Sequence, residues 1–261
     1  MSRIYPICSS SEGNSTFIGT RGHGIIVDAG CSFRALKNSL SFIGTKLDEN
    51  EVEAVFITHE HIDHIKGIEQ LLKQTKIPIF ASSGTLNAMF QNDIPARIFD
   101  ASEGYRSADF EVSAFRTSHD SAMSVGYKIR FGEDTFGVCT DTGIVTAEAE
   151  KALLGCKTVL LESNYDEEML RRNLNYPPDL KRRIMGEFGH LSNACCADFA
   201  LRLVKNGTRH LILGHLSQKN NTPEKARGCV EKYLSANGLF AERDYTISVA
   251  PVLTTGEYIS V

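Results

Sequence analysis

The sequence lacks any long apolar run, and it has no C-x-x-C pair of cysteines. No stretch approaches the roughly 18 apolar residues of a membrane helix, and the first residues contain no apolar signal segment. We therefore expect a cytoplasmic protein without a membrane partner. The seven cysteines are an odd number, which argues against a disulfide framework or a cysteine-rich zinc site. We expect reduced, mostly buried cysteines.

The sequence also has no excess of positive charge. The formal net charge of -4 argues against a protein that coats nucleic acid by bulk electrostatics. Two local basic clusters, Arg171-Arg172 and Lys181-Arg182-Arg183, lie on predicted helices. They are either solvated helix faces or contacts for phosphate, and the sequence leaves both interpretations open.

No low-complexity segment or flexible linker divides the chain. Its 261 residues suit one large domain or two small ones, and 42% hydrophobic residues suffice for a substantial core. Predicted strands and helices alternate, which indicates layered α/β structure. We predict a single domain over residues 1–261, built as a pseudo-symmetric sandwich with the functional site at one edge.

The densest cluster of metal-binding side chains is Thr-His-Glu-His-Ile-Asp-His at residues 58–64, which we call the metal loop. It follows the apolar run 54–57. In an extended segment that leaves a strand, His59 and His61 project to the same side, because side chains alternate with a period of two. Incidental surface histidines are the alternative. Three imidazoles and two carboxylates in seven residues favour a metal site.

The second half of the metal loop adds two more candidate ligands. Asp63 and His64 open the segment 65–73, whose apolar residues have helical spacing. Adjacent ligands at a helix start cannot readily share one ion with His59 and His61. This geometry indicates two neighbouring metal ions.

Further acids and histidines stand where other predicted strands end. The repeated placement argues against coincidence and indicates a shared edge, with candidates at Asp28, His119, Asp141, Glu162 and His215. Asp28 has two possible roles, which spacing alone does not separate. It could orient a metal ligand through a hydrogen bond, or it could cap the helix predicted over 33–42.

Other elements follow from periodicity and turn signals. The sequence predicts further helices over 83–91, 194–204 and 222–237, and strands over 110–117, 124–131 and 134–140. Cys8 to Ser15 reads as a turn-rich connector between two strands, with a ligand-binding loop as the alternative. Ser192 or Asn193 is placed to cap the helix at 194–204, and N–H groups at such a helix start can hold phosphate.

Together these residues resemble the complete ligand series of the metallo-β-lactamase fold, in the correct order and over nearly the whole chain. The resemblance implies an α/β (α+β) fold, the αββα four-layer sandwich. It also implies that His59, His61 and His119 hold one metal, that Asp63, His64 and His215 hold the other, and that Asp141 bridges them. Asp28 would orient a ligand without binding metal itself.

Two features indicate which branch of this fold the sequence resembles most. The bridging position is Asp141, whereas zinc β-lactamases typically have cysteine there, and a carboxylate bridge is usual in the phosphodiesterase and thioesterase branches. Glu162 and His190 resemble the acid and histidine that nuclease branches place beside the metals. Together with the opening Cys-Ser-Ser-Ser-Glu-Gly-Asn-Ser, they look like the small bacterial WalJ/YycJ/VicX-type proteins, which are regarded as exonuclease-like.

The expected function is therefore a dinuclear metal-dependent phosphodiesterase on nucleic acid, a 5'-to-3' DNA exonuclease, acting by metal-activated hydroxide attack on phosphorus. Zinc or manganese is the expected metal, and iron is also compatible. Asp63, Glu162 and His190 are the catalytic candidates, with His190 oriented by Glu162, and Ser192, Asn193 and Ser217 are the phosphate-binding candidates. A buried polar pair that holds two strands together is the alternative for Glu162 and His190. Hydrolysis of another ester or thioester, as in glyoxalase II-like enzymes, and a regulatory binding protein with a retained metal site are the alternatives.

Overall fold

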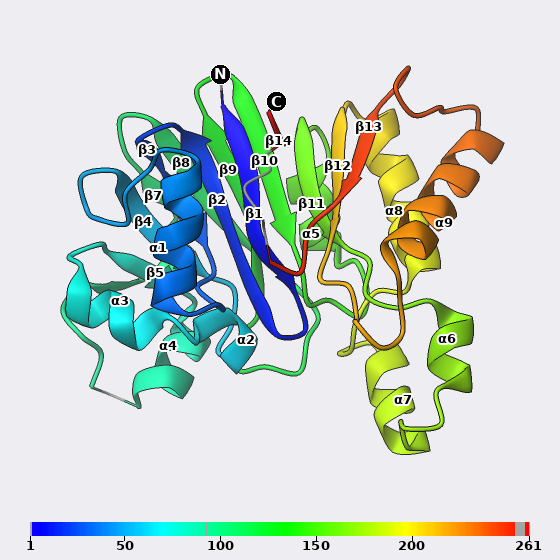
Figure 1. Cartoon of the computed structure of the whole chain (residues 1–261), viewed down its shortest axis with the longest axis horizontal. Coiled ribbons are helices and arrows are strands. Elements are labelled where there is room, and N and C mark those ends of the chain that lie inside the picture. Colours follow the sequence, from blue (N-terminus) through cyan, green and yellow to red (C-terminus); the bar gives the residue numbers. More distant parts are fainter. Residues whose placement is uncertain (1, 92, 254–258, 261) are drawn as a thin grey trace. The chain divides into compact units, whose positions relative to one another are not determined.

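The computed structural model describes residues 2–91, 93–253 and 259–260 (Figure 1). Contacts between Cα atoms group the chain into two compact units. The first unit contains Met1–Ala114, Ser121–Val125 and Pro251–Val261, and the second contains Phe115–Asp120 and Gly126–Ala250. Each unit has its own apolar core. A single domain over the whole chain stays a prediction.

The sheet of the first unit has the strand order β14-β1-β2-β3-β4-β5-β6. Strands β1, β2 and β3 are antiparallel, whereas β3, β4, β5 and β6 run parallel. Parallel strands end at the same edge of a sheet, so the residues that follow β3 and β4 emerge side by side. The strands are β1 (Arg3–Ser10), β2 (Gly13–Thr20), β3 (His23–Val27), β4 (Val52–Ile57), β5 (Ile79–Ala81), β6 (Ile98–Asp100) and β14 (Ile259–Ser260).

Helices of the first unit are α1 (Phe33–Phe42), α2 (Ile62–Ile65), α3 (Ile68–Gln74) and α4 (Ser83–Phe90), with a 3-10 turn at Ala101–Glu103. The helices predicted over 33–42 and 83–91 are confirmed. Helix α1 begins where the Ser32 hydroxyl accepts a hydrogen bond from the Ala35 N–H. Leu36 of α1 and Leu71 of α3 are buried in one core cluster with strand residues such as Val55.

The helix predicted over 65–73 is wrong as one element. Helix α2 ends at Ile65 and α3 starts at Ile68, because Gly67 packs against the backbone beside β3. Its N–H donates to the carbonyl of Ala29 at 2.7 Å. A side chain at this position would come within 2.7 Å of the carbonyl oxygen of Cys31. The short helix α2 therefore carries the end of the metal loop by itself.

The connector predicted from Cys8 to Ser15 is also corrected. Strand β1 continues to Ser10 and β2 starts at Gly13, which leaves a two-residue turn. Ser9 pairs with Asn14 across the two strands, and both are buried. The run of serines resembles a loop in composition, but its backbone is satisfied by the β1–β2 ladder. Asn14 is thereby held in a strand.

In the second unit, strands lie in the order β13-β12-β11-β10-β9. Strands β10 to β13 are parallel neighbours, and β9 pairs with β10 in the antiparallel sense. These strands are β9 (Val125–Phe131), β10 (Asp134–Cys139), β11 (Thr158–Glu162), β12 (His210–Gly214) and β13 (Thr246–Val249). Strands β7 (Tyr105–Arg106) and β8 (Phe110–Arg116) form an antiparallel pair, and this pair belongs to the first unit up to Ala114. The strands predicted over 110–117, 124–131 and 134–140 are confirmed within one residue at each end.

The helices of the second unit are α5 (Ala147–Leu153), α6 (Glu167–Arg172), α7 (Pro178–Met185), α8 (Asn193–Lys205) and α9 (Pro223–Ala236). Helices α8 and α9 lie side by side (Figure 1) and share the core of this unit. They confirm the helices predicted over 194–204 and 222–237. Within the described residues, the structure contains no helix of the length and apolarity that a bilayer crossing requires.

Candidate metal centre

Three of the predicted site residues have left-handed backbone conformations. The φ angles are 61° at Asp28, 53° at Asp141 and 54° at His215. Each residue follows a strand end, after β3, β10 and β12. A left-handed residue other than glycine costs about 1–3 kcal/mol, so the surrounding structure must hold it in place. Such outliers concentrate at functional sites, and here they recur at strand ends in both units.

In the first unit, Asp28 is a buried acceptor for the metal loop. Its Oδ2 lies 2.8 Å from His64 Nδ1, and its Oδ1 accepts from the Thr58 N–H at 2.8 Å. The Thr58 hydroxyl also lies 3.0 Å from both carboxylate oxygens. Since Ser32 caps α1, the capping role considered for Asp28 is wrong. The observed contacts are those of a residue that orients His64.

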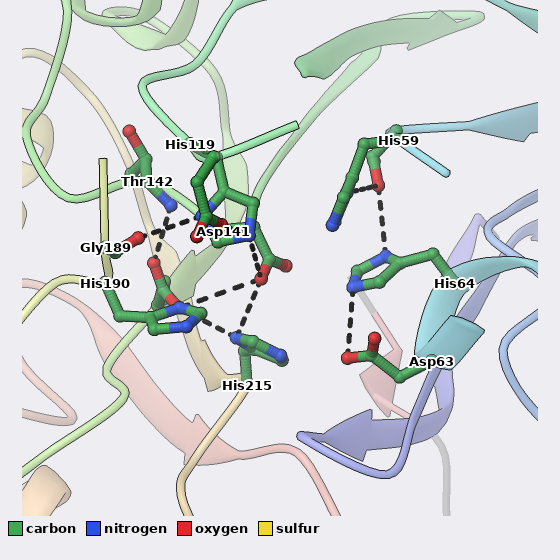
Figure 2. A network of polar contacts seen from close by, with 12 residues as sticks. His59, Asp63, His64, His119, Asp141, Thr142, Gly189, His190 and His215 are labelled. Carbon is green, nitrogen blue, oxygen red and sulfur yellow. Dashed lines mark hydrogen bonds and ion pairs between the residues drawn. The ribbon is translucent and has the colours of Figure 1, made fainter. Parts of the chain in front are cut away.

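The second ring nitrogen of His64 lies beside Asp63 and Asn14. The Nε2 atom is 3.5 Å from Asp63 Oδ2, a contact that Figure 2 shows. The amide nitrogen of Asn14 lies 3.1 Å from this Nε2 and 3.4 Å from Asp63 Oδ2. Asn14 therefore touches two predicted ligands at once. The sequence did not single out Asn14, because it lies inside a segment that has the composition of a turn.

His59 and His61 complete the histidine cluster of the first unit. The His59 and His61 rings have centroids 4.6 Å apart, which confirms that the two side chains share one side of the loop. The ring of His64 lies 4.1 Å from that of His59. Both His59 and His64 are fully buried, so the alternative of incidental surface histidines is wrong. His59 Nδ1 lies 3.1 Å from the Thr58 hydroxyl.

A substitution at Gly30 measures how closely the residues around the metal loop are packed. A Cβ at Gly30 would lie 1.6 Å from the Asp63 carbonyl oxygen and 2.6 Å from the Asn14 nitrogen. We expect Gly30→Ala to lower the free energy of unfolding by about 1–3 kcal/mol, the usual cost of overpacking, as measured by urea denaturation. The control is Gly228→Ala in α9, where a Cβ meets nothing within 4 Å and better helix propensity should stabilise slightly. Wild-type stability for Gly30→Ala would contradict the close packing of the metal loop.

In the second unit, Glu162 is the centre of a polar cluster. Its Oε1 lies 2.8 Å from His190 Nδ1 and 2.8 Å from His215 Nδ1. Its Oε2 accepts from the N–H groups of Thr142 at 2.8 Å and Leu191 at 3.3 Å. The predicted pairing of Glu162 with His190 is confirmed. The contact with His215 was not predicted, and it arises because Glu162 pairs with Gly214 in the β11–β12 register.

Asp141 and His119 lie around the same cluster (Figure 2). Asp141 Oδ1 is 3.5 Å from His215 Nδ1, 3.7 Å from His190 Nδ1 and 3.6 Å from His119 Nε2. The Nδ1 atom of His119 lies 3.0 Å from the Gly189 carbonyl oxygen, and this contact fixes the orientation of the ring. One ligand atom from each of Asp141, Glu162, His190 and His215 fits within 4.8 Å. Asp141 is thus placed to face several imidazoles.

The pKa values of His190 and His119 shift in opposite directions. Burial pulls the pKa of His190 down, but the charges of Glu162 and Asp141 and the bond to Glu162 outweigh it and raise the pKa above the usual value. Conversely, burial opposes ionisation of Glu162, while His190 and His215 lower its pKa overall. Burial is the main cause that lowers the pKa of His119. The directions of these two shifts favour the protonated form of His190 and the neutral form of His119, and a neutral imidazole suits metal ligation.

Four candidate histidines, from both units, share one orientation that fits divalent metals. In His59, His64, His119 and His215 the Nδ1 atom faces a protein oxygen. The Nε2 atoms are therefore oriented as the nitrogens that a metal would meet, as in other histidine-ligated sites. Mixed imidazole and carboxylate donors suit zinc, manganese or iron. The residues thus fit such ions in chemistry and in orientation.

The three candidate phosphate-binding residues use their side chains within the second unit. Ser192 caps α8 by accepting from the Cys195 N–H, which confirms its capping role. Asn193 is buried, and its Oδ1 accepts from the Ser163 hydroxyl at 2.7 Å. The Ser217 hydroxyl accepts from the Asn220 N–H at 3.2 Å. Phosphate binding at these positions stays a prediction.

Comparison with known proteins extends this picture. A family model described as a beta-lactamase superfamily domain matches residues 23–216. Exodeoxyribonuclease YycJ of Bacillus anthracis is 35% identical over 237 residues, which cover 89% of each chain. Exodeoxyribonuclease WalJ of Streptococcus pneumoniae is 31% identical over 248 residues, covering 92% of this chain and 91% of that protein.

Solved structures agree on the fold. The metallo-beta-lactamase fold protein YhfI from Bacillus subtilis superimposes with a TM-score of 0.69 over 97% of this chain and 98% of its own, at 15% identity. With its two sheets, its helices and its match to the family model, the chain belongs to the metallo-β-lactamase superfamily.

Proposed function

We propose that this protein is a metal-dependent phosphodiesterase that acts on nucleic acid, specifically a 5'-to-3' DNA exonuclease. The observation that carries the proposal is the cluster in which Glu162 holds both His190 and His215 beside Asp141. This cluster places His215, an oriented candidate ligand, beside His190, the proposed proton carrier. The names of the YycJ and WalJ relatives, which match over about nine-tenths of their length, support nucleic acid as the substrate.

We further propose two divalent ions, zinc or manganese, with iron also compatible. The ligand series is His59, His61 and His119 for one ion, Asp63, His64 and His215 for the other, and Asp141 between them. Bound ions would supply Lewis acidity, which activates water and neutralises charge on the phosphate. In this proposal Asp28 orients His64 and Glu162 orients His215, each through the Nδ1 atom of the histidine.

His190 is proposed to handle the proton. Its side chain is 22% exposed whereas Glu162 is fully buried, so the imidazole can reach a substrate while its partner stays shielded. Glu162 and Asp141 raise the pKa of His190, so the ring holds its proton more readily than a free imidazole. Such a ring could protonate the departing 3'-oxygen, or it could steady the negative phosphate.

The test uses protein purified without chelator, DNA labelled at its 5' end, RNA of the same sequence, and S-lactoylglutathione. We expect early release of labelled mononucleotide from DNA, loss of this activity in EDTA, and recovery with manganese or zinc. Elemental analysis should find two ions per chain. Thioester hydrolysis without cleavage of nucleic acid would replace the proposal with the glyoxalase II-like alternative, and less than one ion per chain would contradict the dinuclear centre.

A further inference from the structure

A basic groove lies in the second unit, outside the cluster around Glu162. Its volume is about 490 Å³. The groove lies between α6 with the loop that follows it, the loop after β12, and the first turn of α9. Cationic and amide side chains dominate its lining, from Arg172, Asn173, Asn175, Lys219 and Lys225.

The charges of this groove are available to an anion. Arg172 and Lys225 form ion pairs with Glu168 at 2.6 Å and Asp166 at 3.3 Å. Exposed pairs of this kind contribute only about 0–1 kcal/mol, so an entering phosphate can compete for the cations. Lys219 is exposed and forms no ion pair with the part of the chain that the structure describes. Glu168 is the single acid in the lining, so positive charge dominates.

Hydrogen bonds tie the groove to the segment that carries His215. Asn173 donates to the Asn220 side chain at 2.7 Å, and the Asn220 N–H donates to the Ser217 hydroxyl at 3.2 Å. Asn164 in turn donates to the His215 carbonyl oxygen at 2.8 Å. The loop between His215 and the groove is therefore fixed at several points.

The length of this loop limits the distance to the metal centre. Lys219 follows His215 by four residues, so their Cα atoms are at most about 14 Å apart. Successive phosphates of a stacked strand advance by about 3.4 Å along the helix axis. The groove is thus within about four nucleotides of a phosphate at His215.

We infer that this groove binds the phosphodiester backbone of the nucleic-acid strand, beyond the phosphate that is cleaved. The inference rests on the proposed function, since it names a second contact for the same substrate. Lysine, arginine and asparagine side chains are typical donors to phosphate oxygens, and such contacts position a strand without reading its sequence. The groove would therefore hold DNA in register for cleavage.

Lys219→Glu is the test variant, and Lys232→Glu is its control, because Lys232 is an exposed lysine of α9 outside the groove lining. Binding of a fluorescent single-stranded oligonucleotide is measured by anisotropy at 50 and 200 mM salt, and turnover is measured on the oligonucleotide and on bis(p-nitrophenyl) phosphate. We expect Lys219→Glu to weaken binding and raise KM for the oligonucleotide about tenfold. The salt slope should fall by about one phosphate contact.

Lys219→Arg should restore binding, because it restores the cation. Lys232→Glu should match the wild type, and the loss in Lys219→Glu should be far smaller on bis(p-nitrophenyl) phosphate than on the oligonucleotide. Equal losses in the two charge-reversal variants would overturn the inference, as would no binding by the wild type. If the wild type binds the oligonucleotide through Lys219 but never cleaves it, the exonuclease proposal fails while the groove assignment stands.

Discussion

Asp141→Asn is expected to remove metal and nuclease activity together. The proposed role of Asp141 between two ions needs a negative carboxylate, and an amide cannot replace its charge. Metal content should fall below one ion per chain after dialysis. Activity should fall by more than the roughly 10- to 100-fold typical of losing a residue that only orients a metal ligand.

Asparagine is preferred to alanine here because of the backbone. Asp141 has a φ of 53°, and asparagine tolerates this left-handed region better than other residues that have a Cβ. Asp141→Ala should lose metal equally, with an added loss of stability from strain. Glu162→Gln is the companion variant, because in the proposal Glu162 orients His215 and does not contact the substrate. Its loss of activity should stay within the roughly 10- to 100-fold range of a residue that only orients a metal ligand. Full metal content in Asp141→Asn, by elemental analysis of folded protein, would contradict the bridging role.

The second large effect is expected at His190. We expect His190→Ala to retain both ions and to lose about 10²- to 10⁴-fold in turnover on DNA, the usual range for one acid–base group. The cluster should stay folded, because Glu162 keeps its bonds to His215, Thr142 and Leu191. The 3'-alkoxide leaving group of DNA needs a proton, whereas nitrophenolate leaves readily without one. Turnover of bis(p-nitrophenyl) phosphate should therefore fall much less.

His210→Ala provides the matched control for this experiment. His210 is a partly buried histidine of the same unit, and its Nδ1 bonds to the Thr246 hydroxyl at 2.8 Å. It should keep activity on both substrates. Equal losses on both substrates in His190→Ala would favour phosphate clamping over proton donation. Loss of metal with activity would make His190 a ligand, which its place within 4.8 Å of Asp141, Glu162 and His215 would permit.

The sequence predicted this site best where ligands are close together in the chain. The metal loop needed only the alternation of an extended segment to bring His59 and His61 together, and the structure confirms it. Thr58 and Asn14 were missed because their roles depend on how β1, β2, β3 and β4 pair. The capping and orienting roles of Asp28 could not be separated by spacing, since the answer depends on Thr58 and His64 across the sheet edge.

Contacts between segments that are distant in the chain also explain the errors in the predicted secondary structure. Gly67 interrupts a helical pattern because its N–H donates to Ala29, a contact from an earlier strand end that no local window contains. Glu162 was expected to orient His190, and the parallel register of β11 and β12 also brings His215 to the same oxygen. Local spacing thus predicts which residue types gather, while strand register decides which partners they share.

The left-handed turn at Asp141, with a φ of 53°, would set heat resistance against the proposed metal binding. Glycine adopts this conformation without the strain that a side chain brings, so directed evolution for thermal survival of metal-free protein would gain by replacing Asp141 with glycine. The same replacement discards a candidate ligand. At Asp28 and His215 the side-chain hydrogen bonds oppose such a gain. A selection that scores only soluble protein after heating would therefore enrich inactive variants at Asp141, unless activity is scored in every round.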